Sequence, residues 1–351
     1  MRAAVMEAVR EPLVVRDLPD PDCAPDGAVV RVEANGVCRS DWHGWVGDWD
    51  WIGLEFDYPH VLGHEFCGVV EEVGKDVKRF KAGDRVIVPF SQGDGTCEQC
   101  VSGHVNVCEK AFSPGFDYWG GFGRYSHVPV ADTNLVAMPE TMSFVEGAAL
   151  GCRYMTSFHG VVDRAEVTAG EWVAVHGCGG IGLSAVQIAT ALGANVIAVD
   201  IDEAKLDFAR EVGAVETVLA GRNEDPAKAI RQLTKGGAHV AVDALGIQAT
   251  CQAATRSLRR RGRHLQIGQT GRDEEGMIGF PIDVMLAKEL TVVATNGMQP
   301  SRYDVMLNMI TAGKLDPKKL ITRTIPLEET GEVMASMDDY ATTGFVVIDR
   351  Y

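Results

Sequence analysis

A regular alternation of strand-like and helix-like segments, beginning near Glu171, constrains the fold of this chain more than any other feature. Short apolar runs occur at Trp172–Val175, Val196–Asp200, Val240–Asp243 and His264–Ile267. Stretches with apolar residues at helical spacing follow the first two runs, at Ile181–Leu192 and Glu203–Val212. This alternation is typical of parallel βαβ units, which form a sheet with helices on both faces.

A glycine-rich turn joins the first strand to the first helix of this region. The segment Gly177-Cys178-Gly179-Gly180-Ile181-Gly182 satisfies the pattern G-x-G-x-x-G. Such glycines let the backbone turn sharply and approach a pyrophosphate at the helix N-terminus. A generic tight turn is the alternative interpretation, but a strand precedes this pattern and a helix follows it, as dinucleotide binding requires. The turn therefore predicts a dinucleotide site formed by Gly177, Gly179, Gly180, Ile181 and Gly182.

The residue that ends the next predicted strand indicates which dinucleotide is bound. Asp200 lies 18 residues after Gly182. An acidic side chain at this position accepts hydrogen bonds from the adenosine ribose and repels a 2′-phosphate. The neighbouring Asp202 and Glu203 add to this repulsion, so NAD is favoured over NADP. Lys205 can contact the ribose of either cofactor.

The two ends of the chain have a different character. Residues 1 to about 150 contain short apolar stretches, such as Ala28–Val32, Cys67–Val73 and Arg85–Pro89, separated by turns rich in Gly, Pro and Asp. Mixed character returns after about Asn296, and the chain ends in the apolar stretch Phe345–Ile348. We therefore expect an α/β protein in which a doubly wound parallel-sheet domain (153–296) is inserted into a β-rich domain (1–152 and 297–351).

Composition limits the class of protein and its partners. A length of 351 residues suits two domains. The net charge of −16 disfavours binding to nucleic acid. No apolar run approaches the ~20 residues of a membrane span, and the N-terminus lacks the features of a signal peptide. We expect a cytoplasmic protein with neither nucleic acid nor membrane as a partner. The odd number of cysteines, nine, favours metal binding over a disulfide framework.

One group of cysteines has the spacing of a metal site that lacks a ligand. Cys97, Cys100 and Cys108 follow the pattern C-x2-C-x7-C, and Asp94 lies three residues before the first. Structural zinc takes four tetrahedral ligands, and a carboxylate is a permitted substitute for a thiolate. Two interpretations remain open. Either Asp94 completes an occupied structural site, or the site is weakened and packing alone holds the segment of about 91–112.

Three further segments supply ligands for a second metal ion. They are Gly36–His43, Gly63–Glu65 and Leu150–Arg153. One imidazole and two thiolates from these segments would leave a fourth zinc position open for water or substrate. The alternative for each cysteine taken singly is a small buried apolar residue.

Taken in order, GVCRSDWH, GHE, the cysteine run and the glycine turn resemble the zinc-dependent medium-chain alcohol dehydrogenases over essentially the whole chain. The resemblance implies a GroES-like catalytic domain with an inserted Rossmann domain. It implies a catalytic zinc on Cys38, His64 and Cys152, and a structural zinc in the cysteine run. By the same resemblance Glu65 can approach or replace the fourth ligand, and Asp41 orients the zinc-bound imidazole.

The resemblance also implies an activity. Members of this family reversibly oxidise primary or secondary alcohols to aldehydes or ketones: a zinc-bound alkoxide forms and transfers hydride to NAD. Ser40 and His43 match the family's proton relay, in which the imidazole passes the proton to solvent. Thr156 resembles the threonine that packs against the nicotinamide. We expect a small-molecule substrate and a homo-oligomer, either a homotetramer or a homodimer.

Aromatic residues suggest the nature of the substrate. Phe90 resembles a pocket aromatic of the family, and several tryptophans, including Trp49 and Trp51, follow Cys38 closely. We expect Phe90, Trp49 and Trp51 to line a bulky apolar pocket. The alternative, that the tryptophans are core or interface residues, stays open.

Three other functions are alternatives for a chain with these motifs. Polyol or sugar dehydrogenases of the same superfamily often use a carboxylate as the third zinc ligand, whereas this chain has Cys152. Zinc-independent reductases of the same fold lack the Cys-His-Cys set. A non-catalytic nucleotide-binding relative would have no use for Ser40 and His43.

Overall fold

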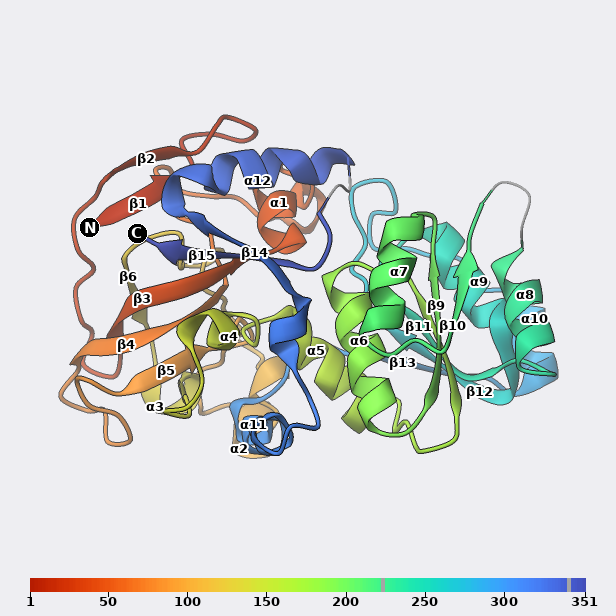
Figure 1. The fold of residues 1–351 in the computed structure, drawn as a ribbon. Coiled ribbons are helices and arrows are strands. Elements are labelled where there is room, and N and C mark those ends of the chain that lie inside the picture. Colours follow the sequence, from red (N-terminus) through yellow and green to blue (C-terminus); the bar gives the residue numbers. More distant parts are fainter. Residues whose placement is uncertain (222–224, 340–341) are drawn as a thin grey trace. The chain divides into compact units, whose positions relative to one another are not determined.

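The structure is a computed structural model that describes residues 1–221, 225–339 and 342–351. These residues form two compact units. The first contains residues 1–155, 297–308 and 321–351, and the second contains residues 156–296 and 309–320. Figure 1 shows that the first unit is rich in strands and contains both chain termini, whereas the second alternates strands and helices.

The first unit is built on one large sheet, which has seven strands in the part of the chain described. Its order is β14-β15-β3-β4-β5-β7, and β6 also pairs with β3. The strands are β3 (Ala28–Val37), β4 (Glu65–Val73), β5 (Arg85–Val88), β6 (Tyr125–Val128), β7 (Val136–Ala137), β14 (Ile321–Pro326) and β15 (Phe345–Arg350). All pairs are antiparallel except β14 with β15. A separate hairpin joins β1 (Arg2–Val5) to β2 (Val14–Asp17).

Short helices connect these strands. They are α1 (Arg39–Trp45), α2 (Glu98–Val101), α3 (Ala131–Asn134), α4 (Phe144–Ala148) and α12 (Thr330–Ser336). The helix α11 (Tyr303–Thr311) belongs to the first unit up to Asn308 and to the second from Met309. Single 3-10 turns occur at η1 (Asp50–Ile52), η2 (Val105–Val107), η4 (Pro300–Arg302), η6 (Leu327–Glu329) and η7 (Met337–Asp339). The helix α5 (Arg153–Phe158) contains the boundary between the units and continues into the π-helix η3 (His159–Arg164).

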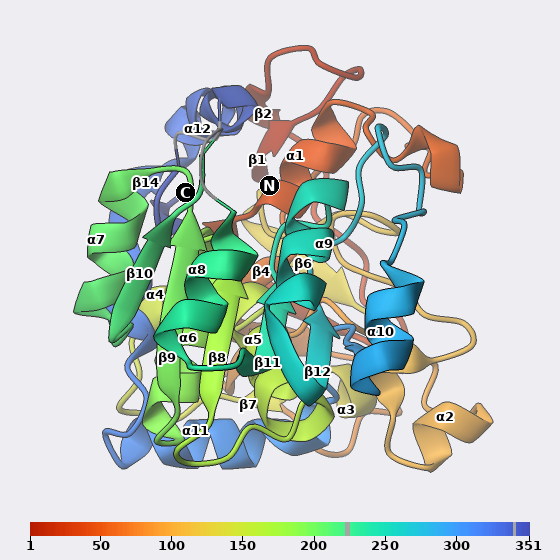
Figure 2. The same ribbon diagram turned by 90° about the vertical axis from the view of Figure 1, so that its right-hand side faces the viewer.

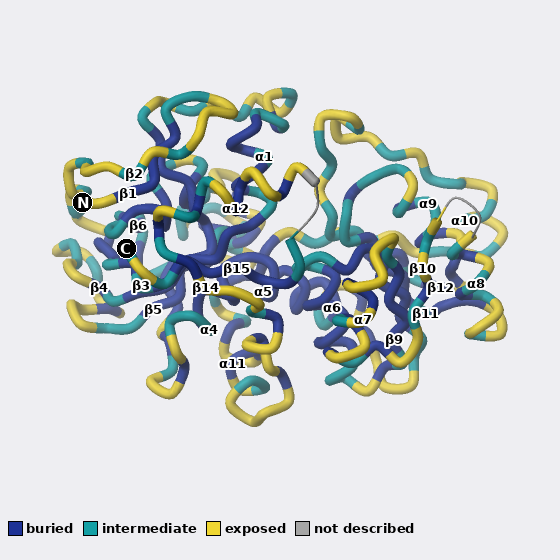
Figure 3. The backbone as a smooth tube through the Cα atoms, turned by 45° about the horizontal axis from the view of Figure 1, so that its top comes forward, coloured by how far each residue is buried: buried dark blue, intermediate teal, exposed yellow. Residues whose placement is uncertain are grey.

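The long strands β3 and β4 form the centre of the first unit: β3 is buried over most of its length and β4 over its first half, where the tube in Figure 3 is mostly dark. Ala28, Val30 and Val32 point into one apolar cluster, while Val37 belongs to another that contains Trp42 and Trp45 of α1. The residues that follow β3 and precede β4 are buried as well. The ends of β3 and β4 are where Cys38 and His64 lie.

The second unit contains a parallel sheet, six-stranded among the described residues, in the order β10-β9-β8-β11-β12-β13. The strands are β8 (Trp172–His176), β9 (Asn195–Asp200), β10 (Glu216–Leu219), β11 (Ala238–Asp243), β12 (Leu258–Gln266) and β13 (Thr291–Ala294). The helices are α6 (Gly180–Ala191), α7 (Glu203–Glu211), α8 (Pro226–Leu233), α9 (Gln248–Ser257) and α10 (Ile282–Lys288), with the 3-10 turn η5 at Pro317–Leu320. Figure 2 shows this sheet with its flanking helices.

This strand order places a binding crevice in the second unit. The chain enters the sheet at its middle strand, β8, extends outward to β9 and β10, and then crosses back to β11. In such doubly wound sheets ligands bind at the carboxyl ends of the strands where the order reverses, here β8 and β11. The prediction of an α/β protein with a β-rich part and a Rossmann-type sheet is confirmed by this architecture.

Candidate active site

Four buried side chains converge in the first unit from three distant segments. Cys38 caps α1, His64 and Glu65 lie at the start of β4, and Cys152 immediately precedes α5. Their ligand atoms all lie within 4.8 Å of one another. The structure therefore brings together the three predicted zinc ligands and adds the carboxylate of Glu65 to the group.

The backbone before His64 has a conformation that only glycine tolerates well. Gly63 has φ +100°, and a Cβ atom there would lie 2.6 Å from the main-chain nitrogen of Phe122. Glycine avoids both the strained dihedral angle and this clash. The sequence Gly-His-Glu thus turns the chain sharply, so that the imidazole enters the cluster as β4 begins.

Asp41 positions the imidazole of His64. Its Oδ1 accepts hydrogen bonds from Nδ1 of His64 (2.8 Å) and from the main chain of Gly63 (3.0 Å), and its Oδ2 accepts one from the main chain of Cys38 (3.0 Å). Because Nδ1 keeps its hydrogen and donates it to the carboxylate, the lone pair of the neutral imidazole lies on Nε2. That Nε2 atom is buried and has no hydrogen-bond partner. A metal ion held by Nε2 fits this arrangement.

The thiols of Cys38 and Cys152 share a hydrogen bond that stabilises one thiolate in the pair. Hydrogen bonding with Cys152 holds the pKa of Cys38 well below its ordinary value, and the neighbouring His64 and Arg153 favour the same thiolate. The same contact, together with burial, raises the pKa of Cys152 well above its ordinary value. The second thiolate thus needs a cation to form, and a divalent metal that displaces thiol protons on binding fits this pair.

Glu65 does not approach the cluster freely, because Arg153 holds it. Nε of Arg153 donates to both carboxylate oxygens (2.8 and 3.1 Å), and its main-chain N–H donates to Oε1 (3.0 Å). Both residues are buried. Burial raises the pKa of Glu65, and the guanidinium opposes that shift. Sequence reasoning missed the role of Arg153, although a buried carboxylate requires a nearby cation and Arg153 adjoins a ligand.

The second cluster contains the four residues of the cysteine run. Ligand atoms of Asp94, Cys97, Cys100 and Cys108 also lie within 4.8 Å of one another. Oδ1 of Asp94 accepts main-chain hydrogen bonds from Thr96 (2.8 Å) and Cys97 (3.0 Å). These donors, Thr96 foremost, lower the pKa of Asp94, which keeps an anionic oxygen among the three sulfurs. One oxygen and three sulfurs are a suitable donor set for tetrahedral zinc.

The glycine turn and Asp200 lie together in the second unit. A Cβ at Gly177 would lie 1.6 Å from Leu245, and one at Gly182 would lie 1.7 Å from the Gly177 carbonyl oxygen. A Cβ at Gly179 would meet no atom within 4 Å, which leaves room for a phosphate. Oδ2 of Asp200 accepts a hydrogen bond from the main chain of Cys178 (2.6 Å), so the carboxylate borders the turn.

Aromatic rings surround the first cluster. Phe90 meets the His64 ring edge-on with centroids 6.0 Å apart. Phe116, which sequence reasoning missed, lies 5.3 Å from the His64 ring and 6.0 Å from Trp49. Phe116 follows no recognisable motif, and only the fold brings it here. Trp51 lies in η1, and its Nε1 is buried without a hydrogen-bond partner.

The remaining predicted residues occupy defined places. The Ser40 hydroxyl lies 3.9 Å from Sγ of Cys38, and Nδ1 of His43 lies 2.5 Å from Asp48. Lys205 and Thr156 belong to the second unit and are buried; Oγ1 of Thr156 has no hydrogen-bond partner.

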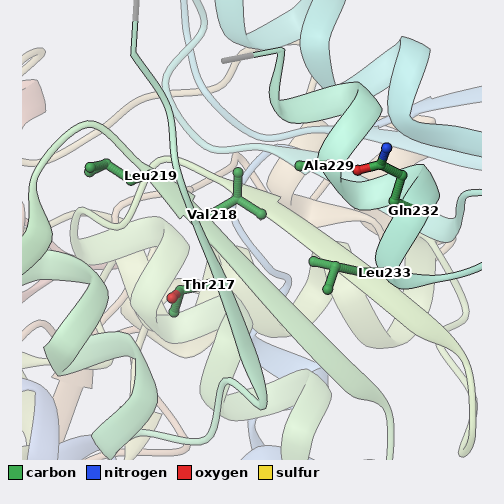
Figure 4. Close-up of a pocket in the computed structure, with 6 residues that line it drawn as sticks. All are labelled: Thr217, Val218, Leu219, Ala229, Gln232 and Leu233. Atoms are coloured by element: carbon green, nitrogen blue, oxygen red, sulfur yellow. The ribbon is translucent and has the colours of Figure 1, made fainter. Parts of the chain in front are cut away.

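A separate hollow of about 430 Å³ lies between β10 and α8 in the second unit (Figure 4). Its lining is apolar apart from two uncharged polar side chains, and consists of Thr217, Val218, Leu219, Ala229, Gln232 and Leu233. Without an ionisable group it offers no acid, base or metal ligand, so the two clusters and the glycine turn remain the candidate sites. No helix in the described parts of the chain has both the length and the apolar character to cross a membrane.

Comparison with known proteins agrees with this assignment. Residues 180–312 match the zinc-binding dehydrogenase family and residues 24–140 match the GroES-like domain of alcohol dehydrogenases. An alcohol dehydrogenase of Geobacillus stearothermophilus is 33% identical over 99% of both chains. A probable D-xylulose reductase A of Emericella nidulans is 33% identical, over 87% of this chain and 84% of that protein. A solved NAD-dependent alcohol dehydrogenase is 31% identical, with a TM-score of 0.86 over 100% of both chains.

A buried Cys-His-Cys cluster in a GroES-like unit, with a glycine turn on a doubly wound sheet, defines a class of zinc-binding oxidoreductases. The chain belongs to the zinc-containing alcohol dehydrogenase family of medium-chain dehydrogenases. The resemblance seen in the sequence is thereby confirmed, and zinc and NAD are confirmed as cofactors at the level of this family.

Proposed function

We propose that the protein is a zinc-dependent, NAD-linked alcohol dehydrogenase that reversibly oxidises primary or secondary alcohols to aldehydes or ketones. The observation that carries this proposal is the unpartnered Nε2 of His64, oriented by Asp41 among the thiols of Cys38 and Cys152. Three ligands leave one zinc position open, as catalytic rather than structural sites do.

Each group has a role in this mechanism. Cys38, His64 and Cys152 hold the zinc, which when bound acts as a Lewis acid toward the substrate oxygen. The Ser40 hydroxyl accepts the substrate proton while it releases its own proton toward His43, and the imidazole passes a proton to solvent. The glycine turn binds the pyrophosphate of NAD, Asp200 accepts from its ribose, and Thr156 contacts the nicotinamide. Lys205 adds a contact to the ribose. The second cluster, Asp94 with three cysteines, holds a structural zinc.

We propose an apolar pocket for the substrate. Phe90, Phe116 and Trp49 form a chain of rings that meets the His64 imidazole from two sides. Such rings favour aromatic or extended alcohols over hydrated polyols. Trp51 is the further aromatic residue that we assign to this pocket.

A polyol substrate is the second candidate, because a D-xylulose reductase is among the relatives. Cys152 as the third ligand, together with the apolar rings, favours simple alcohols. The deciding experiment measures NADH formation with primary, secondary, aromatic and polyol substrates, with zinc content determined on the same preparation. Turnover of sorbitol but not of simple alcohols would support the polyol candidate. NAD binding without turnover of any alcohol would instead support a non-catalytic relative.

We also propose that the protein is a cytoplasmic homotetramer. Large apolar side chains are exposed near the edge strand β13: Met277, Ile282, Leu286 and Val292. Exposed apolar area next to an unpaired strand edge is typical of an oligomer interface. Light scattering of the purified protein tests the subunit number, with a dimer as the alternative result.

A further inference from the structure

The imidazole of His43 is held by an acidic residue in the loop that follows α1. Nδ1 of His43 lies 2.5 Å from Oδ2 of Asp48, and the two side chains are only 15% and 19% exposed. The main-chain N–H of Asp48 also donates to the His43 carbonyl at 2.9 Å. The loop therefore folds back on the helix end and brings the carboxylate to the ring.

Two further features fix this geometry. Trp49 stacks on the imidazole at 10° with centroids 4.7 Å apart, and Trp42 meets it edge-on at 5.0 Å. The turn passes through Gly47, which has φ +68° and would place a Cβ 3.0 Å from Val9. Because a side chain at Gly47 would be strained and crowded, the turn depends on glycine. The ring plane of His43 is thus set before any substrate binds.

A carboxylate has no proton to give at neutral pH, so Asp48 accepts and Nδ1 of His43 carries the hydrogen. This tautomer leaves the lone pair on Nε2. We propose that Asp48 is a positioning residue for the dehydrogenase reaction: it holds His43 as the Nδ1–H tautomer, so that Nε2 receives the substrate proton. The inference rests on the relay role of His43 in the proposed function.

The charges around His43 support this assignment. Burial lowers the pKa of His43, Asp48 raises it, Arg39 lowers it, and Cys38 raises it. The carboxylate of Asp48 therefore keeps a desolvated imidazole basic enough to accept a proton. A nearby carboxylate shifts such a pKa by about one unit or more. Removal of Asp48 should lower the pKa of His43 further.

The direct test is nitrogen-15 NMR of the zinc-loaded protein labelled on histidine. His43 is identified among the nine histidines by the signal lost in His43→Asn. We expect the Nδ1–H form in the wild type, and a mixture or the Nε2–H form with a lower pKa in Asp48→Ala. Glu55→Gln, which neutralises an exposed acid seven residues after Asp48 in the sequence, should match the wild type. Unchanged tautomer and titration in Asp48→Ala would overturn the proposal.

Kinetics distinguish this inference from the proposed function. Asp48→Asn should lower kcat for alcohol oxidation about tenfold. It should also move the acid limb of the pH profile of kcat to lower pH, because an imidazole with a lower pKa stays neutral down to a lower pH. When His43 is already replaced by Asn, Asp48→Asn should not lower kcat further. If Asp48→Asn lowers kcat equally with and without His43, the inference is overturned. If His43→Asn alone leaves the pH profile unchanged, the relay role fails, while the NMR result still decides on Asp48.

Discussion

Arg153 and Glu65 form a buried ion pair that connects two ligand-bearing segments of the metal cluster. Glu65 directly follows His64, and Arg153 directly follows Cys152. The arginine binds the carboxylate through both its side chain and its main chain. Its guanidinium also lies 4.0 Å from the centre of the Phe345 ring, so it is fixed on a second side. The carboxylate of Glu65 is thereby held in a fixed orientation beside the three predicted zinc ligands.

Arg153→Met should destabilise the protein by about 3–5 kcal/mol, because it leaves a buried carboxylate without its cation. Without the guanidinium the pKa of Glu65, already raised by burial, should rise further. A raised carboxyl pKa gives stability at low pH that is lost as pH increases. The loss should therefore be larger at pH 8 than at pH 5, as measured by urea unfolding.

Two variants control this measurement. The pair Arg323–Glu329 is exposed, so Arg323→Met should cost less than about 1 kcal/mol. The double variant Glu65→Gln with Arg153→Met should recover much of the lost stability, because no charge is left unpaired. Equal losses in the buried and exposed single variants would contradict the assignment.

The parts of the site defined by local sequence were predictable. The glycine turn, its strand and its helix follow from short-range patterns, and α6 (Gly180–Ala191) lies within one residue of the predicted helix. Cys97 and Cys100 share one turn of chain, so their spacing alone indicates a metal site. Both features are determined by residues that lie close together in the sequence.

The contacts made by distant residues were not predictable. Glu65 and Arg153 are 88 residues apart, and only the folded structure reveals their pairing. Phe116 likewise contacts His64, but it lies in an irregular loop whose sequence has no periodic pattern from which the contact could be predicted. The parallel pairing of β14 with β15 was also missed, because short strands carry no information about their partners.

Asp41→Asn should weaken zinc binding at the first cluster about 10- to 100-fold. The carboxylate accepts three hydrogen bonds through its two oxygens. An amide has one oxygen, and its NH2 group, itself a donor, would face at least one of these N–H donors. The orientation of His64 is then lost. Competition with a chelator measures the effect, and the exposed Asp57→Asn serves as the control. Unchanged zinc retention in Asp41→Asn would count against the role of Asp41.

Replacement of Asp94 should change the zinc content of the protein and leave catalysis intact. The wild type should hold about two zinc ions per subunit, and Asp94→Ala about one. Asp94→Cys should retain both ions more firmly, since a thiolate is a softer ligand. Metal analysis after dialysis against a chelator gives the count, and turnover should persist in both variants. A wild type with one zinc ion would mean that packing alone holds the segment of residues 91–112.

His176 makes the stability of the second unit sensitive to acid. It is buried at the end of β8, its Nε2 has no hydrogen-bond partner, and burial, with His264, lowers its pKa to about 3. In the unfolded chain its pKa is about 6.5, so the unfolded state binds the extra proton as pH falls. Stability present above about pH 6.5 should therefore decline toward pH 3, by up to about 1.4 kcal/mol per pH unit. His176→Leu should flatten this decline between pH 7 and 5 in urea unfolding, whereas the exposed His104→Asn should not. Parallel curves for His176→Leu and the wild type would show that His176 is not the group responsible.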